Sequence, residues 1–556
     1  MGTARVLVKP PTLQSANLIV RSPSPAIEVP DVTVGAFVLR QAERLADKPA
    51  IIDGPTGRTL SYGQFADMVR RVATALDRRG FRKGDVFAVY SHNVPEYAVV
   101  FNAVALVGGV VTTANPLCTA AELTKQLKDS RPRLMVTAPP YLDKAKEAAA
   151  AAGVETLYLF GGEGAQREDG VRPFDELLDA PPNPPSVSIT PSEDVVVLPY
   201  SSGTTGLPKG VMLTHRNVVA NLCQINGAEA FDGFQERDRI LAVLPLFHIY
   251  GMVVVLKLGL ANGATIVTMP RFDFEEFLAT IQKYRITNLP IVPPLVLALL
   301  KSPLVSGYDL SSVRMIFSGA APLGEAQAIE LQQRLNCQVR QGYGMTEASP
   351  VTHISPTVEG VPAKIGSVGR PVPNTEVKIV DAATGEPVGA PRAEGELLIR
   401  GPQIMKGYLN KPDDTAASID PEGWYHTGDI GYVDEEGWFY IVDRTKELIK
   451  YKGMQVAPAE LEALLLTHPA VLDVAVVRRP DEEAGEIPKA FVVLKPDPES
   501  RATTGESIMA WVSERVSPHK KVRRLEFVDQ IPKSPSGKIL RRLLVDGSGE
   551  IAARSR

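Results

Sequence analysis

Apolar positions in the first part of the chain alternate between helical and strand spacing. After Ser61, which opens a capping box, apolar residues recur every three or four positions as far as Leu76. This pattern predicts an amphipathic helix. An apolar run at 86–90, a helical pattern at 96–107 and a β-branched run at 110–113 follow. Strand, helix and strand in this order predict a parallel β-sheet with crossover helices.

The same alternation continues along the chain. Strand patterns recur at 134–137, 265–269 and 315–317, and helical patterns at 274–284 and 325–335. This order predicts one large α/β body. From about residue 375, short apolar runs broken by glycines predict a β-rich subdomain. Helical and strand patterns after Arg444 predict a small α+β domain, so we place an N-terminal domain at 1–444 and a C-terminal domain at 445–556.

Composition narrows the functional classes. The 556-residue chain has a formal net charge of −4, which gives no field strong enough to attract nucleic acid or an anionic membrane. Residues 1–30 contain no apolar run long enough for a signal peptide or a membrane span, and we interpret them as a loose arm. Cys118, Cys223 and Cys337 lack metal-ligand spacing. We expect a cytoplasmic protein without a transmembrane segment and leave its oligomeric state open.

A loop rich in glycine and hydroxyl groups, at 200–210, is the segment most informative about chemistry. Glycines let the backbone approach a polyanion, hydroxyl and N–H groups can donate to phosphate oxygens, and Lys209 adds a positive charge. A Walker A loop is excluded because Gly210, and not Ser or Thr, follows Lys209. The loop therefore predicts a phosphate cradle, with a flexible surface loop as the alternative.

Five motifs along the chain carry a resemblance to a known family. They are SSGTTGLPKG at 201–210, QGYGMTE at 341–347, YHTGD at 425–429, DRTK at 443–446 and KSPSGK at 533–538. Together they resemble the adenylate-forming superfamily of acyl-CoA synthetases, luciferases and adenylation domains. LPLFHIY at 244–250, SGAAPLG at 318–324 and ELIKYKG at 447–453 make the chain most similar to 4-coumarate:CoA ligases.

The resemblance implies an ATP-dependent carboxylic acid:CoA ligase that forms an acyl-adenylate, releases pyrophosphate, and then transfers the acyl group to CoA with release of AMP. The implied ATP- and AMP-binding residues are Ser201, Ser202, Gly203, Thr204, Thr205, Gly206, Lys209, Gly319, Ala320, Ala321, Gln341, Gly342, Tyr343, Gly344, Thr346, Asp429 and Arg444. Thr204 and Glu347 would position Mg²⁺. Taken alone, Glu347 suits a solvated surface acid and Asp429 suits a turn cap.

The resemblance also implies that the C-terminal domain moves between the two steps. The implied catalytic residues are Lys538, His248, Lys450, Gln455 and Lys446, and those for CoA are Arg271, Lys452 and Gly453. Lys538 would stabilise charge in the first step, and rotation about Lys446 would then bring in the Lys450 face. His248 would orient the substrate. Taken alone, Lys538 suits a mobile exposed lysine and His248 a packed structural residue.

The implied acyl pocket is mostly apolar. Its residues are Tyr250, Val253, Phe317, Ala320, Gly342, Gly344, Pro350 and Val351. Plant coumarate ligases commonly have lysine where Phe317 stands and often asparagine where Val253 stands. Losing both polar groups removes a means of recognising a phenol, so we expect a broader preference that covers cinnamate-like and medium- or long-chain aliphatic acids.

Three other functions are compatible with part of these motifs. An amino-acid adenylation enzyme with a carrier-protein thiol would present an aspartate in the segment 247–250, where none occurs. A luciferase-like oxidase shares the first step and most motifs. A non-catalytic nucleotide sensor would have lost the lysine that stands at position 538.

Overall fold

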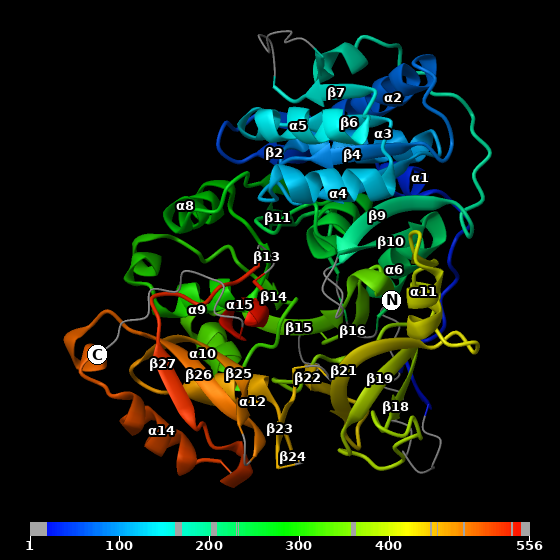
Figure 1. Cartoon of the computed structure of the whole chain (residues 1–556). Coiled ribbons are helices and arrows are strands. Elements are labelled where there is room, and N and C mark those ends of the chain that lie inside the picture. Colours follow the sequence, from blue (N-terminus) through cyan, green and yellow to red (C-terminus); the bar gives the residue numbers. More distant parts are fainter. Residues whose placement is uncertain are drawn as a thin grey trace, which may run out of the picture.

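The computed structural model describes most of the chain. The described residues are 19–161, 170–201, 208–228, 231, 233–356, 363–444, 447–452, 454–481, 484–516, 518–534 and 537–545. They form three sheets in a large N-terminal body and one sheet in a smaller C-terminal domain (Figure 1). None of their helices is both long and apolar enough to cross a membrane.

The first sheet has eight strands in the order β20-β10-β9-β5-β4-β6-β7-β8. Its strands are β4 (Val86–Tyr90), β5 (Val110–Ala114), β6 (Leu134–Thr137), β7 (Thr156–Leu159), β8 (Val171–Pro173), β9 (Val195–Ser201), β10 (Lys209–Thr214) and β20 (Gly407–Tyr408). The accompanying helices are α2 (Tyr62–Arg78), α3 (Pro95–Leu106), α4 (Ala120–Ser130), α5 (Leu142–Ala152) and α6 (His215–Gly227). The capping box at Ser61 confirms the predicted start of α2, and the order β4, α3, β5 with parallel pairing of the two strands confirms the predicted strand–helix–strand unit.

The second sheet has nine strands in the order β17-β16-β15-β14-β13-β11-β12-β2-β3. They are β2 (Pro49–Asp53), β3 (Thr59–Ser61), β11 (Arg239–Ala242), β12 (Thr265–Thr268), β13 (Asn288–Ile291), β14 (Met315–Ser318), β15 (Gln338–Gly344), β16 (Val351–Ile354) and β17 (Arg370–Pro371). Its helices are α1 (Val34–Leu39), the π-helix η3 (Tyr250–Leu258), α7 (Gly259–Ala261), α8 (Phe274–Tyr284), α9 (Pro293–Lys301) and α10 (Glu325–Leu335). The strands β11, β13, β14 and β15 run parallel, so their carboxyl ends share one edge.

The third sheet is the predicted β-rich subdomain. It contains β1 (Ile19–Arg21), β18 (Glu376–Val380), β19 (Gly395–Arg400), β21 (Tyr425–Val433) and β22 (Phe439–Arg444), with α11 (Pro412–Ser418) beside it. The interpretation of 1–30 as a loose arm is wrong at 19–21, which pair antiparallel with β18. This pairing covers the edge of β18, and an ion pair of 2.8 Å between Arg21 and Glu376 accompanies it.

The C-terminal domain has its own sheet and core. Its elements are β23 (Ile449–Tyr451), β24 (Met454–Val456), α12 (Pro458–Leu465), β25 (Val471–Asp481), β26 (Gly485–Leu494), α13 (Pro498–Arg501), α14 (Gly505–Ser513), β27 (Arg524–Phe527) and α15 (Arg541–Val545). The boundary predicted at residues 444 and 445 lies between β22 and β23. The domain contacts the body where Lys301 Nζ of α9 donates to the Val471 carbonyl at 3.1 Å.

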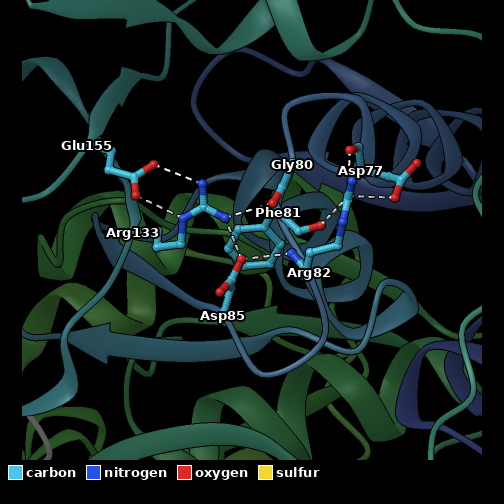
Figure 2. Close-up of polar contacts among 7 residues, drawn as sticks. All are labelled: Asp77, Gly80, Phe81, Arg82, Asp85, Arg133 and Glu155. Carbon is cyan, nitrogen blue, oxygen red and sulfur yellow. Dashed lines mark hydrogen bonds and ion pairs between the residues drawn. The ribbon is translucent and has the colours of Figure 1, made fainter.

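An ion-pair network lies where three strands of the eight-stranded sheet begin (Figure 2). Arg133, which precedes β6, binds Asp85 Oδ2 at 2.6 Å and the Gly80 carbonyl at 2.7 Å. It also binds both carboxylate oxygens of Glu155, before β7, at 2.9 and 3.0 Å. Asp85, before β4, accepts the Arg82 backbone N–H at 2.8 Å as well. Arg133, directly before β6, therefore binds the segments that lead into its two neighbouring strands, β4 and β7.

Replacing Arg133 by Ala removes the side-chain donor of the Gly80 carbonyl and one of the two donors of the partly buried Asp85, which keeps the Arg82 N–H. We expect the melting temperature of Arg133→Ala to fall by roughly 2–4 °C. The matched control is Glu155→Ala, because the Glu155 side chain is 56% exposed and its pairing is screened by water. Its melting temperature should fall by less than about 1 °C. The melting temperatures are measured by calorimetry. An equal fall in both variants would show that Arg133 contributes no more to stability than its exposed ion pair with Glu155.

Candidate active site

The glycine-rich loop connects two paired strands. Ser201 ends β9 and Lys209 begins β10, and the two residues are antiparallel partners. The predicted cradle residues Ser202, Gly203, Thr204, Thr205 and Gly206 lie outside the described residues. Lys209 Nζ lies 2.8 Å from Asp414 Oδ1 and 4.9 Å from the ring centre of Tyr408. Both ends of the predicted phosphate loop are therefore held by the hairpin.

Glu347 lies directly beside this hairpin. Its side chain is buried, with 6% exposure, so the surface-acid alternative does not apply. Oε1 accepts hydrogen bonds from Ser201 Oγ at 2.9 Å and from the Tyr408 hydroxyl at 3.0 Å. Oε2 has no partner within the part of the chain that the structure describes. A free carboxylate oxygen next to a phosphate loop fits Mg²⁺, which prefers hard oxygen ligands.

Asp429 connects the second and third sheets. The Tyr343 hydroxyl, on β15, donates to Asp429 Oδ2 at 2.5 Å, and Arg444 Nε lies 3.2 Å from Oδ1. Asp429 on β21 and Arg444 on β22 are partners in the sheet register. Burial raises the pKa of Asp429, while Arg444 acts in the opposite direction. The side chain does not cap the neighbouring turn, and its remaining lone pairs can accept hydroxyl donors.

The loop after β14 is held by a side chain of the neighbouring strand β15. Ala320 has a left-handed φ of 68°, a conformation that is costly for a residue with a Cβ and often marks functional loops. Gln341 Oε1 accepts the Leu323 N–H at 3.0 Å and its Nε2 donates to the Leu323 carbonyl at 3.1 Å. Gln341 therefore positions the loop that contains Gly319, Ala320 and Ala321.

Lys538 reaches the site from the C-terminal domain. The preceding Gly537 packs on Val292, where an added Cβ would lie 3.0 Å from Val292 Cγ2. Burial, and then Arg444, lowers the pKa of Lys538, whereas Asp429 and Glu347 raise it. The Lys538 side chain is half-buried, and it is not in the exposed class that the alternative interpretation would give.

His248 lies at the start of the π-helix. Its Nδ1 accepts the Tyr250 N–H at 3.3 Å. Burial, with a smaller contribution from Lys538, lowers the pKa of His248 to about 3. The imidazole is therefore neutral across physiological pH and is suited to orient a substrate.

An apolar cavity adjoins the loop after β14. It is lined by Ile225, Phe231, Gly233, Phe234, Tyr250, Val254, Asn288, Leu289, Pro290, Met315, Phe317, Val351 and Ile354. Of the predicted pocket residues, Tyr250, Phe317 and Val351 line the cavity, whereas Val253, Ala320, Gly342, Gly344 and Pro350 do not. Tyr250 donates to the Phe317 carbonyl at 2.8 Å, which fixes its ring against the strand.

The part of the cavity wall formed by β13 was not predicted from the sequence. Asn288 and Pro290 lie on one face of this strand, next to Met315 and Phe317 of β14. The segment 288–291 is short, and its asparagine and proline interrupt the alternation of apolar and polar residues by which a strand is recognised in a sequence.

Comparison with known proteins gives a consistent result. The AMP-binding enzyme family matches residues 38–409, and the AMP-binding enzyme C-terminal domain matches residues 460–538. The chain belongs to the AMP-binding enzymes. This confirms the predicted superfamily.

This AMP-binding enzyme has relatives along its whole length. It is 46% identical over 532 residues to 4-coumarate–CoA ligase 1 of Petroselinum crispum, covering 95% of this chain and 96% of the relative. The anthranilate CoA ligase AuaEII in complex with anthranoyl-AMP superposes with a TM-score of 0.84 at 26% identity, covering 93% and 97% of the two chains. ATP-bound MatB from Rhodopseudomonas palustris gives a TM-score of 0.82 at 26% identity, covering 93% and 99%. The predicted fold class is therefore confirmed.

The residues implied for CoA transfer are not gathered at the site of this AMP-binding enzyme. Lys450 is exposed on the β23–β24 hairpin, at the edge of the C-terminal sheet and away from β14 (Figure 1). Arg271 and Lys452 are also exposed. Lys446, Gly453 and the side chain of Gln455 lie outside the described residues. Lys538, and not the exposed Lys450, therefore lies among the charges of Asp429, Arg444 and Glu347.

Gly342 gives a test of the cavity. A Cβ there would lie 2.9 Å from Phe317 Cε1 and 3.2 Å from the His353 carbonyl, so Gly342→Ala pushes the Phe317 ring into the cavity. We expect kcat/KM for an aryl acid such as cinnamate to fall by about 10-fold or more, and by less for a short acid such as butyrate. In the control Gly307→Ala, the added Cβ meets no atom within 4 Å, so kcat/KM should stay unchanged for both acids. An equal fall in kcat/KM for both acids in Gly342→Ala would contradict the assignment of this cavity as the acyl pocket.

Proposed function

We propose that this enzyme activates an apolar carboxylic acid with ATP and transfers the acyl group to the thiol of CoA. The observation that carries the proposal is the place of Lys538, among Asp429, Arg444 and Glu347. The apolar cavity is linked to Lys538 through Tyr250, which lines the cavity and donates its N–H to His248, because Lys538 contributes to the lowered pKa of His248. A carboxylate whose acyl group occupies the cavity is thereby brought to the lysine.

In the proposed first step, a carboxylate oxygen attacks the α-phosphorus of ATP and pyrophosphate leaves. Lys538 supplies a fixed positive charge where negative charge accumulates on the carboxylate and the α-phosphate. Asp429 accepts the ribose hydroxyls, and the loop at 319–321 with Tyr343 brackets the adenine. Mg²⁺ held by Glu347 would neutralise charge on the departing pyrophosphate.

In the proposed second step, the CoA thiolate attacks the acyl carbonyl and AMP leaves. Lys538 must then withdraw, and rotation of the C-terminal domain about Lys446 brings the Lys450 face to the carbonyl. Arg271 and Lys452, both exposed, bind the phosphates of CoA. His248, uncharged at neutral pH, orients the two reactants.

The cavity supports a cinnamate-like acid, with an extended aliphatic acid as the alternative. Its lining is aliphatic and aromatic except at Asn288 and Gly233. No lining residue is a carboxylate that could pair with an α-ammonium group, which disfavours an amino-acid substrate. The three cysteines are free, which is consistent with a cytoplasmic location.

Separate variants of two lysines test the two steps. Lys538→Ala should slow adenylate formation by roughly 10²- to 10³-fold, because one preorganised stabilising charge is lost. It should affect CoA attack on a preformed adenylate much less. Lys450→Ala is the matched control and should slow thioester formation while pyrophosphate release continues. Pyrophosphate release and acyl-CoA formation are measured separately.

The products give an independent check. ATP, Mg²⁺, CoA and cinnamate should yield AMP, pyrophosphate and cinnamoyl-CoA. Formation of ADP, or loss of the same step in both lysine variants, would overturn the proposal.

A further inference from the structure

Lys209 is paired with a carboxylate where the glycine-rich loop ends. Its Nζ lies 2.8 Å from Asp414 Oδ1, and the two residues have no other ion-pair partner within the described part of the chain. The Lys209 side chain is 12% exposed, whereas that of Asp414 is 37% exposed. A largely buried ammonium group needs a nearby anion, but a carboxylate that is partly exposed can be hydrated instead. The lysine therefore depends on an anion more than Asp414 depends on the lysine.

The ammonium group of Lys209 also lies close to the proposed magnesium ligand. Lys209 Nζ is 4.9 Å from the ring centre of Tyr408, and the hydroxyl of this tyrosine donates to Glu347 Oε1 at 3.0 Å. Lys209 pairs across the hairpin with Ser201, whose hydroxyl donates to the same carboxylate oxygen at 2.9 Å. Because one tyrosine contacts both groups, phosphates that bind beside Glu347 would meet Lys209, which binds phosphate as a point charge.

Asp414 is held in place without help from Lys209. It lies on α11, and the next residue, Thr415, accepts the Tyr408 N–H through Oγ1 at 2.9 Å. Tyr408 belongs to β20, which pairs antiparallel with β10, the strand that begins at Lys209. The helix that carries Asp414 is therefore fixed to the hairpin by contacts that remain when the ion pair opens.

We infer that Asp414 is an exchangeable counter-ion for Lys209: it pairs with the lysine when no nucleotide is bound, and the phosphates of ATP displace it. The inference rests on the proposed function, in which pyrophosphate departs beside Glu347. Opening the ion pair uses part of the free energy with which ATP binds, and the charge of Asp414 repels the phosphates. When pyrophosphate departs, Asp414 recaptures the lysine and so favours release. Asp414 is thus a positioning residue that acts through Lys209.

Direct binding of nucleotides tests this role. In calorimetric titrations of the full chain with Mg²⁺ and no acid, Asp414→Asn should bind ATP roughly 3- to 10-fold more tightly than the wild type. Its affinity for AMP, which lacks the β- and γ-phosphates, should change by less than about 2-fold. Asp414→Glu keeps the charge and should bind ATP with nearly the wild-type affinity.

The matched control is Asp413→Asn. It removes the same charge from the preceding residue of α11, which is exposed. Its affinity for ATP should stay within about 2-fold of the wild-type value, because an exposed charge is screened by water. Asp414→Ser serves as a second replacement if the asparagine variant is unstable.

An Asp414→Asn variant that binds ATP no more tightly than the wild type, or an equal gain in Asp413→Asn, would overturn the inference. An equal gain in affinity for AMP would also overturn it, because it would indicate a general change in the nucleotide site. A wild-type protein that binds neither ATP nor AMP would instead overturn the proposed function. The two failures are therefore distinguishable.

Discussion

The structure depends on the neutralisation of a buried acidic group where its sheets meet. Asp429 is buried, and its two partners, Tyr343 and Arg444, come from the second and third sheets. A buried carboxylate is tolerated only when donors and positive charge surround it. Lys538 adds charge from the C-terminal domain and also faces Glu347. The arrangement of the two lobes is thus linked to the charge balance of the site.

Much of the fold could be predicted where the local pattern is periodic. The helices α8 and α10 begin and end at the predicted residues, because apolar residues recur regularly through both. The strand β1 could not be predicted, since three residues form it only by pairing with a partner about 350 positions away. The π-helix at 250–258 is buried on all sides, so its sequence lacks the amphipathic pattern by which a surface helix is predicted.

The candidate site was predicted by motif resemblance rather than by periodicity. Glu347, Asp429 and Lys538 are far apart in sequence, and only the folded sheets bring them together. The spacing of residues could not show that Gln341 holds a loop or that Asn288 faces the cavity. Both roles depend on which side of a strand packs against a neighbouring segment, and strand pairing decides this.

The same charge balance gives a physical reason for the proposed alternation of the lobes. When ATP is bound, its phosphates add negative charge beside Asp429 and Glu347, so a nearby lysine is strongly retained. Departure of pyrophosphate removes most of this added charge, while Arg444 remains beside Asp429 and still repels Lys538. The lysine is then held less firmly, and its withdrawal leaves Asp429 with Tyr343 and Arg444 as partners. Release of the first product would therefore favour the rotation that we propose for the second step.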